Sequence, residues 1–268
     1  MFPLFVYDPD DPRISAFRAV RERDLVGREG QFIAEGEVVL RMLIRSTRHK
    51  PKAVLIDGKR IEKLAALLSE LPYDVPVYAG TQAVLDAIAG FHLHRGILAI
   101  AERGLQPTTV ELLSTLSDNA LVVVAIGIAN HDNIGGIFRN AAAFGADAVL
   151  LDPESCDPFY RKAIRVSVGA VLSVPSARFL SNDELFEALG QGSFTPFALS
   201  PSGNLTLTEL KPPARSAVLM GAEGPGLPAE VLARSTTVRI SMAEGFDSLN
   251  VGTACGIVLH HLRSRPNC

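Results

Sequence analysis

The sequence has no tryptophan and only three cysteines, Cys156, Cys255 and Cys268. The cysteines are far apart, odd in number and outside any Cys-x-x-Cys motif, so we expect neither a disulfide scaffold nor a cysteine-rich zinc site. No apolar run approaches the roughly 20 residues that a membrane-spanning helix needs. The opening MFPLFVYDPDDPR lacks the basic segment and the cleavage region of a secretory signal. These absences predict a cytoplasmic protein with no metal centre and no membrane association.

The composition indicates a folded protein. Apolar residues make up 47% of the 268 residues and charged residues 21%, which allows a sizeable core and excludes global disorder. The 22 glycines and 17 prolines follow no period, which excludes collagen-like and low-complexity chains. The length lies between one typical domain and two large ones.

Charge is unevenly distributed along the chain. The net charge is −3, but residues 13–63 hold 13 Lys and Arg against 7 Asp and Glu, a local balance of +6. From residue 64 onward the count is 13 basic against 19 acidic residues, a balance of −6. A basic front end on an acidic remainder suggests a module that binds a polyanion. A solvated helical face is an equally good explanation of the charge alone.

Strand and helix patterns alternate along the chain, as expected for an α/β protein with a parallel sheet. The first part predicts strands at 53–57, 75–79 and 96–101 and helices at 59–71 and 81–89. The second part predicts strands at 120–129, 146–152, 217–221 and 237–241 and helices at 134–144, 182–189 and 249–262, with a helix–strand pair before residue 175 and a short helix after Pro228. The stretch ERGLQPTT at 102–109 loses the apolar pattern, and we expect a domain boundary there.

The first of three motifs runs from Asn133 to Leu151 as NIGGIFRNAAAFGADAVLL. It follows a buried strand and opens a helix, which places its first residues where open α/β sheets bind ligands. Asn133 can cap this helix. Arg139 stands among apolar residues and needs a partner or an anion. An acid paired with it for packing would satisfy Arg139 equally well.

The second motif is LMGAEGPGLP at 219–228, with three glycines around Glu223. Its spacing matches neither GxGxxG nor the Walker loop, and it predicts a tight turn that brings backbone groups near a ligand. Glu223 can pair with a cation such as Arg139. A plain connecting turn with a solvent-exposed acid is the alternative.

The third motif is ISMAEGFDSLNVGTACGIVLHHL at 240–262. A strand ends near Met242, and Ser248 is a natural N-cap for the helix that follows a short loop. The free N–H groups at the start of that helix suit polar ligand atoms. The small residues of the helix permit close packing on a neighbour, and a plain capped C-terminal helix would also explain them.

Together, in this order and spacing, the three motifs resemble those of the SpoU (TrmH-type) class of SPOUT methyltransferases, over roughly residues 118–268. The segment FIAEGEVVLRMLI at 32–44 resembles the RNA-substrate-binding domain often found in front of that class. The resemblance implies a small ribosomal-protein-like α/β domain over residues 1–105, with an N-terminal extension. It also implies a catalytic domain over 106–268, a parallel sheet whose C-terminal segment forms a trefoil knot, and a homodimer with its sites at or near the interface.

The resemblance further implies methyl transfer from S-adenosylmethionine to a ribose 2′-hydroxyl in rRNA or tRNA. The implied cofactor-binding residues are Leu219, Met220, Gly221, Ile240, Met242 and Leu249. The implied catalytic and RNA-contacting residues are Asn133, Arg139, Glu223, Ser248 and Asn250. The family assigns Arg139 as base or hydroxyl orienter, and because a guanidinium stays protonated, positioning and charge stabilisation are the physically safer role.

The sequence departs from the family pattern at Ala222, where relatives often have Asn, and this removes one polar contact. In FHLHRGILA at 91–99, only His94 and Gly96 match the His-x-Gly pattern of relatives.

Two other functions are alternatives to a methyltransferase. A catalytically silent RNA-binding or ribosome-assembly relative would not need all five catalytic residues. A nucleotide-cofactor dehydrogenase would need a GxGxxG after an early strand and an acid about 20 residues later, and the sequence has neither.

Overall fold

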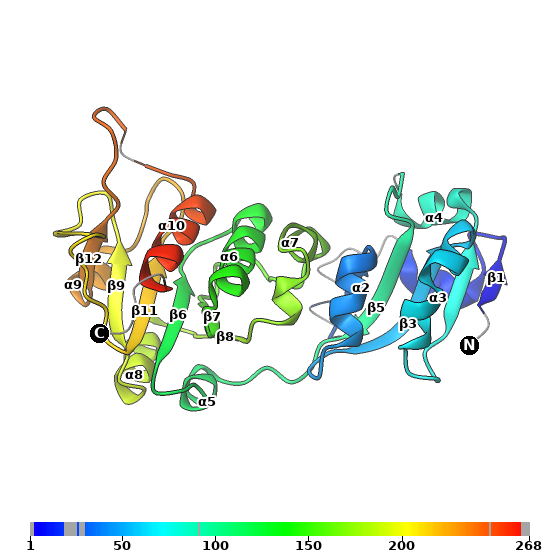
Figure 1. Ribbon diagram of the computed structural model, residues 1–268, viewed down its shortest axis with the longest axis horizontal. Helices are drawn as coiled ribbons and strands as arrows, with labels where there is room; N and C mark the ends of the chain where they lie inside the picture. The colour runs from blue at the N-terminus through cyan, green and yellow to red at the C-terminus, as the bar shows by residue number, and fades with distance from the viewer. Residues whose placement is uncertain (1–2, 19–25, 27–29, 91, 247, 264–268) are drawn as a thin grey trace. The chain divides into compact units, whose positions relative to one another are not determined.

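The computed structural model describes residues 3–18, 26, 30–90, 92–246 and 248–263 (Figure 1). The chain divides into two compact units. Unit 1 comprises Met1–Leu105 and Phe159–Ser173, and unit 2 comprises Gln106–Pro158 and Val174–Cys268. Among the described residues, no helix is long and apolar enough to cross a membrane.

Unit 1 is built on a five-stranded mixed sheet. Its strands are β1 (Leu4–Val6), β2 (Gln31–Glu35), β3 (Lys50–Asp57), β4 (Val77–Gly80) and β5 (Ile97–Glu102). Its helices are η1 (Pro12–Phe17), α2 (Glu37–Ile44), η3 (Gly58–Arg60), α3 (Ile61–Ser69), α4 (Gln82–Ala89), α7 (Arg161–Val166) and η4 (Ala170–Leu172).

The strand order in unit 1 is β1-β4-β3-β5-β2. The β5 strand runs antiparallel to both β2 and β3, whereas β4 is parallel to β1 and β3. The expectation of a parallel sheet is therefore wrong for this unit. The predicted alternation of strands and helices is confirmed. Strand direction depends on which neighbouring strand each strand pairs with, and the periodicity of a segment carries no information about its neighbour.

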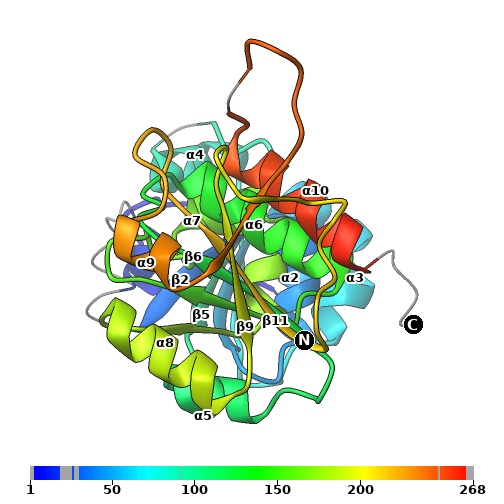
Figure 2. The ribbon, with the colours of Figure 1, turned by 90° about the vertical axis from the view of Figure 1, so that its left-hand side faces the viewer.

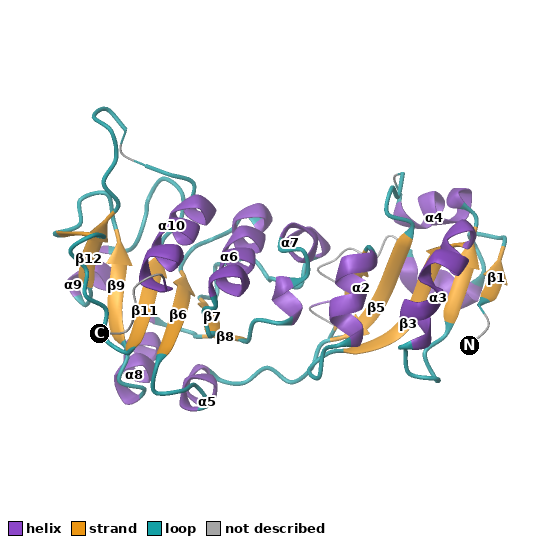
Figure 3. Cartoon of the chain, in the orientation of Figure 1, coloured by secondary structure: helices purple, strands orange, loops and turns teal. Residues whose placement is uncertain are grey.

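Unit 2 is built on a seven-stranded sheet. Its strands are β6 (Ala120–Ala125), β7 (Ala148–Leu151), β8 (Ser176–Arg178), β9 (Thr195–Leu199), β10 (Leu205–Thr206), β11 (Arg215–Met220) and β12 (Thr236–Arg239). Its helices are α5 (Thr109–Ser114), α6 (His131–Phe144), α8 (Asn182–Gln191), α9 (Ala229–Ala233) and α10 (Val251–Arg263). Figure 3 distinguishes these helices and strands by colour.

Every strand pair in unit 2 is parallel, in the order β10-β12-β9-β11-β6-β7-β8. The interior strand β6 is buried along its whole length, in keeping with its continuous apolar sequence ALVVVA. Side chains of α5, α8 and α9 share one core cluster with alternate residues of β6 and β11. Helices α6 and α10 pack against each other and cover the opposite face (Figure 2). The parallel arrangement predicted for this part of the chain is confirmed.

The loop after β6 shows why the strand is shorter than its apolar run predicts. The run continues to residue 129, but β6 ends at Ala125 because Gly127 turns the chain with φ of +70°. Asp152 Oδ2 accepts the Gly127 N–H at 2.9 Å, and Ser155 Oγ accepts the Ile128 N–H at 3.0 Å. These bonds satisfy backbone groups that have left the sheet and set the position from which α6 begins.

Candidate active site

A cavity of about 500 Å³ lies at the carboxyl ends of β9, β11 and β12 in unit 2. Loops that follow the strands of a parallel sheet meet at this edge, which is where such sheets bind ligands. The lining residues come from three chain segments: the end of β9 and the loop after it, the turn after β11, and the stretch from the end of β12 to the start of α10. The lining residues are Leu199, Ser200, Pro201, Met220, Gly221, Ala222, Glu223, Gly224, Gly226, Val238, Ile240, Met242, Ser248, Leu249, Asn250, Val251 and Ala254.

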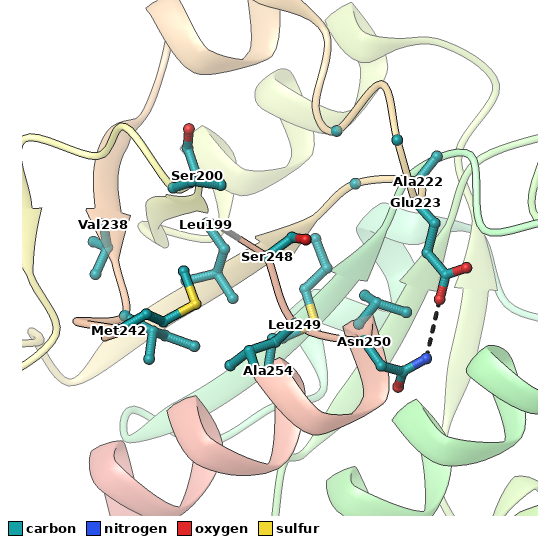
Figure 4. Close-up of a pocket in the computed structure, with 17 residues that line it drawn as sticks. Leu199, Ser200, Ala222, Glu223, Val238, Met242, Ser248, Leu249, Asn250 and Ala254 are labelled. Atoms are coloured by element: carbon teal, nitrogen blue, oxygen red, sulfur yellow. Dashed lines mark hydrogen bonds between the residues drawn. The ribbon is translucent and has the colours of Figure 1, made fainter. Parts of the chain in front are cut away.

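The cavity has an apolar and a polar end. In Figure 4, Glu223 and Asn250 lie together at one end, joined by a hydrogen bond, whereas Val238 and Met242 lie at the other. An apolar pocket with a few converging polar groups is typical of a site for a small organic molecule.

The turn after β11 is held closed by a backbone contact at Gly221. A Cβ atom on Gly221 would lie 2.3 Å from the carbonyl carbon of Gly226 and 2.4 Å from the nitrogen of Leu227. The Gly226 N–H donates to the Ala222 carbonyl at 3.0 Å, which closes the same turn. No side chain fits at position 221, so the glycine is required for the backbone to curl against the cavity.

Three predicted site residues, one from each sequence motif, form a hydrogen-bonded triangle. Asn133 Nδ2 donates to Glu223 Oε1 at 2.8 Å, and Asn250 Nδ2 donates to the same oxygen at 3.0 Å. Asn250 Nδ2 also donates to Asn133 Oδ1 at 2.8 Å. Within the described part of the chain, Glu223 Oε2 accepts no hydrogen bond, so this oxygen remains available to a ligand.

Two helix caps differ from the sequence expectation. The α6 helix begins at His131 and is capped by Asn130, whose side chain accepts the Asp132 N–H, so Asn133 lies inside the helix and its amide faces Glu223. The α10 helix begins at Val251, and Asn250 Oδ1 accepts the N–H groups of the second and third helical residues at 2.9 and 3.3 Å. Asn250 rather than Ser248 is therefore the N-cap, because the helix begins two residues later than its apolar pattern predicts.

Arg139 lies outside the cavity. It stands on the exposed side of α6, and no hydrogen-bond or ion-pair partner for it exists among the residues that the structure describes. The expected pairing with Glu223 is not formed, since Glu223 binds the two amides instead. Six residues separate Arg139 from Asn133, about 240° around a helix, so the two side chains leave α6 on different sides.

Close packing of α6 on α10 connects the first motif with the third. A Cβ on Gly136 would lie 3.7 Å from Gly252 Cα, and Asn140 Nδ2 donates to the Gly252 carbonyl at 2.6 Å. The small residues expected to permit close packing do so within unit 2.

Neither described cysteine has the properties of a nucleophile. Burial raises the pKa of the Cys156 thiol to about 11 and that of Cys255 to about 12. Both remain protonated at neutral pH, and a covalent cysteine mechanism would need a thiolate.

Most of the predicted cofactor-binding residues line the cavity. Met220, Gly221, Ile240, Met242 and Leu249 lie on its wall, together with the predicted catalytic residues Glu223, Ser248 and Asn250. The Leu219 side chain is buried in the core, so only its backbone can take part. Asn133 is not among the lining residues, but its side chain is hydrogen-bonded to Glu223 and Asn250, which are.

Sequence reasoning missed the segment Leu199–Pro201 and the lining residue Val238. No strand was predicted at β9, whose sequence TPFAL is interrupted by a proline. A strand prediction there would have placed the following residues at the same sheet edge as the other loops.

The profile of the SpoU rRNA Methylase family matches residues 120–260. This chain belongs to the SpoU family. The resemblance inferred from the three motifs is therefore confirmed.

Individual relatives match well beyond the SpoU profile. An uncharacterized tRNA/rRNA methyltransferase of Mycobacterium bovis is 38% identical over 264 residues, which covers 95% of this chain and 90% of the relative. The 23S rRNA (guanosine-2′-O-)-methyltransferase RlmB of Salmonella typhi is 28% identical over 224 residues, 81% of this chain and 91% of the relative. Among solved structures, the AdoMet-bound rRNA methyltransferase from Sinorhizobium meliloti has a TM-score of 0.81 at 23% identity and covers 97% of both chains, so it shares the fold.

S-adenosylmethionine (AdoMet) fits the chemistry of the cavity in this SpoU family member. The volume lies within the roughly 300–1,000 Å³ typical of small-molecule sites. Met242, Leu249 and Val238 offer apolar surface for an adenine ring, and the Gly221 turn exposes backbone groups beside it. The polar end can hold the ribose and amino-acid parts by hydrogen bonds.

Proposed function

We propose that this SpoU family member transfers a methyl group from AdoMet to the 2′-hydroxyl of a ribose in rRNA or tRNA. The observation that supports this most directly is the triangle of Asn133, Glu223 and Asn250, which joins all three family motifs beside a cavity of suitable size. The RlmB relative, named as a 23S rRNA guanosine 2′-O-methyltransferase, supports the same chemistry.

The cavity residues hold and orient the cofactor in this proposal. When bound, AdoMet supplies an electrophilic methyl group on a sulfonium. Met220, Ile240, Met242 and Leu249 would hold the apolar part of AdoMet and would exclude water from it. The close backbone turn at Gly221 fixes the position of this wall, so that the reactive group is presented in one orientation.

The polar residues act on the ribose. The 2′-hydroxyl is a poor nucleophile and needs alignment with the methyl group and help in losing its proton. Glu223 Oε2 accepts a hydrogen bond from the 2′-hydroxyl and takes up its proton, while Asn133 and Asn250 hold the carboxylate in place through Oε1. Ser248, exposed at the cavity edge, orients the same group. Arg139 stabilises the charge of the developing alkoxide and of the RNA phosphate.

We further propose a homodimer in which Arg139 of one protomer serves a site at the interface. Arg139 is exposed and does not reach the cavity of its own chain. The apolar side chains of Phe246, Leu249 and Ile257, at and beside α10, are 76%, 40% and 39% exposed, which is unusual unless another surface covers them. Sedimentation velocity at micromolar concentration should give a dimer, and a monomer would contradict this proposal.

The trefoil knot expected of the SPOUT fold is also a proposal for this chain. The parallel order places β11 between β6 and β9, and the chain leaves β12 through the cavity-lining segment before α10 returns to pack on α6. This path is compatible with a knotted C-terminal segment. An experimental electron-density trace through residues 215–263 would test it.

Unit 1 is proposed to bind the RNA substrate. It carries the basic excess of residues 13–63. An excess of positive charge attracts nucleic acid without regard to sequence and makes the affinity fall with salt.

The test of the proposed function is methyl transfer in vitro. Purified protein, AdoMet labelled on the methyl group, and separate rRNA and tRNA substrates that lack the modification should give label in one RNA at a ribose 2′-oxygen. The Arg139→Ala variant should lose about 100-fold or more in rate, because a group that stabilises transition-state charge is removed. Its AdoMet affinity by calorimetry should stay within about twofold, since Arg139 lies outside the cavity.

Arg139→Lys serves as the matched control, because it keeps the charge without the planar fork. It should recover part of the rate. If Arg139→Ala instead loses AdoMet binding, Arg139 has a structural role. If the unaltered protein binds AdoMet and RNA but transfers no methyl group to either RNA, the chain is a silent binding relative.

A further inference from the structure

Two sequence segments of unit 1 that play no part in the proposed methyl transfer meet at one cavity. The first contains Glu35 and Gly36, and the second contains His92, His94 and Arg95. The cavity has a volume of about 520 Å³ and is lined by Glu35, His92, His94, Arg95 and Arg165. All of these residues belong to unit 1. The pairing of β2 with β5 brings the two segments together, since Glu35 lies opposite Leu98.

Glu35 is a buried carboxylate with an unused acceptor. It ends β2, and the residue is only 4% exposed. Its Oε2 atom has no hydrogen bond within the described residues, and Arg165 Nη1 lies 3.9 Å from it. A buried charged oxygen without a hydrogen-bond donor is costly. A ligand with suitably placed N–H groups would remove that cost.

Positive charge surrounds this carboxylate. Gly36 has φ of +95°, and a Cβ on it would lie 2.8 Å from Arg95 Cδ and 3.4 Å from Arg95 Nη1. The glycine therefore lets the Arg95 side chain cross directly beside the residue after Glu35. With Arg165 on the same cavity, a free metal cation is disfavoured, and a ligand that combines donor groups with an anionic part is favoured.

The two histidines form an ordered aromatic surface. His92 Nδ1 is 2.8 Å from Asp86 Oδ2, and its ring meets the His94 ring edge-on at a centroid distance of 4.5 Å. Hydrogen bonds from the Leu93 N–H and from His92 lower the pKa of Asp86 to about 2, so the anchoring group stays ionised. Histidine rings are among the side chains on which unstacked RNA bases lie.

We propose that this cavity binds a guanine nucleotide of the RNA substrate in single-stranded form, with the Watson–Crick edge of the base donating to Glu35. Guanine is the standard base that presents two adjacent donors, N1–H and the N2 amino group, on that edge, and a carboxylate can accept both. The base stacks on the histidines, and the phosphates are held by Arg95 and Arg165. This inference rests on the proposed function only in taking RNA as the substrate.

The experiment measures RNA binding by the full chain without AdoMet, so that it is independent of methyl transfer. The probes are fluorescently labelled single-stranded pentamers with a central G, A or inosine between uridines, and free GMP is the competitor. The G pentamer should bind about tenfold or more tightly than the A pentamer, the size expected for a bidentate base contact. Inosine, which lacks the N2 amino group, should lie between them.

The variant Glu35→Gln keeps the shape of the side chain but replaces one acceptor by a donor, and it should reduce the preference for G to within about twofold. Glu62→Gln, an exposed glutamate on α3 of the same unit, is the matched control and should keep the full preference. If Glu35→Gln fails to fold, the inosine pentamer removes the same contact from the ligand side of the unaltered protein.

Equal binding of all three pentamers, or an unchanged preference in a folded Glu35→Gln variant, would overturn the proposal. Free GMP that competes as well as the G pentamer would overturn the assignment to RNA, because the RNA strand would then contribute nothing. A protein that prefers G but transfers no methyl group would refute the proposed function and leave this site standing. Methyl transfer by a protein that shows no preference for G would support the proposed function and refute this site.

Discussion

Asn250 combines two structural tasks that substitution can separate. Its Oδ1 atom caps α10 by accepting the N–H groups of Gly252 and Thr253, and its Nδ2 atom donates to Asn133 and Glu223. Serine at this position would keep the cap and lose the amide donor. Alanine would lose both, and aspartate would keep the cap but place a second carboxylate beside Glu223.

The expected magnitudes follow from these contacts. Loss of an N-cap destabilises a helix by about 1 kcal/mol. Loss of the Nδ2 donor leaves Oδ1 of Asn133, a residue only 6% exposed, without its partner at a cost of about 1–3 kcal/mol. Asn250→Ala should therefore destabilise unit 2 by about 2–4 kcal/mol, and Asn250→Ser by about 1 kcal/mol less than Asn250→Ala.

Asn250→Asp should respond to pH where the other two variants do not. Its carboxylate would lie about 3 Å from Glu223 Oε1, where two charges in water repel by about 1.4 kcal/mol. Acidification that protonates one of the two removes this repulsion. Relative to Asn250→Ser, the aspartate variant should thus gain stability as the pH falls below about 5.

Urea unfolding gives the free energies, and hydrogen exchange at the Gly252 and Thr253 amides reports the cap itself. Both amides should exchange faster in Asn250→Ala than in Asn250→Ser. Equal stability of the alanine and serine variants would refute the cap. A serine variant as stable as the unaltered protein would refute the contribution of the hydrogen-bonded triangle.

Two further outcomes can be checked on the same preparations. Gly221→Ala should weaken AdoMet binding by about tenfold or more, because its Cβ would lie 2.3 Å from a backbone atom. The control Gly190→Ala, at an exposed helix position with open space around it, should leave AdoMet binding unchanged and the stability equal or up to about 1 kcal/mol higher. Equal AdoMet affinities of Gly221→Ala and the unaltered protein in calorimetry would contradict the requirement for glycine in this turn. Burial lowers the pKa of His49 from 6.5 to about 4. Between these two pH values the unfolded chain binds a proton that the folded chain does not. The free energy of unfolding should therefore fall by about 2 kcal/mol from pH 7 to pH 5, relative to that of a His49→Phe variant. Parallel pH profiles of the two proteins in urea titrations would show that His49 titrates normally.

Local sequence determined much of unit 2. The apolar run of β6 predicts a strand buried on both faces, and the helix after it follows from the 3.6-residue spacing of Ile134, Ile137, Phe138 and Ala141, all of which are buried. The glycines around Glu223 correctly predict a tight turn. These features depend on the backbone preferences and side-chain spacing of a few consecutive residues, which a sequence records directly.

Hydrogen bonds between residues that are far apart in the chain depend on the tertiary structure alone. Glu223 binds an amide 90 residues away rather than Arg139, and Asn250 binds Asn133 across 117 residues. Residue types alone favour a carboxylate–guanidinium pair, but the register between α6, the β11 turn and the start of α10 places amides there instead. The N-caps of α6 and α10 differ from the predicted residues for the same reason, because tertiary contacts rather than helix propensity determine the first residue of each helix.

The sequence by itself thus determined the family, the α/β elements and the segments that carry the chemistry, because motif order and periodicity are properties of consecutive residues. The antiparallel β5, the grouping of 159–173 with unit 1, the contribution of Leu199–Pro201 to the cavity and the meeting of Glu35 with His92 and Arg95 were decided by tertiary structure. Each of these depends on which strand pairs with which, a choice made by the total burial of the folded unit rather than by any single segment.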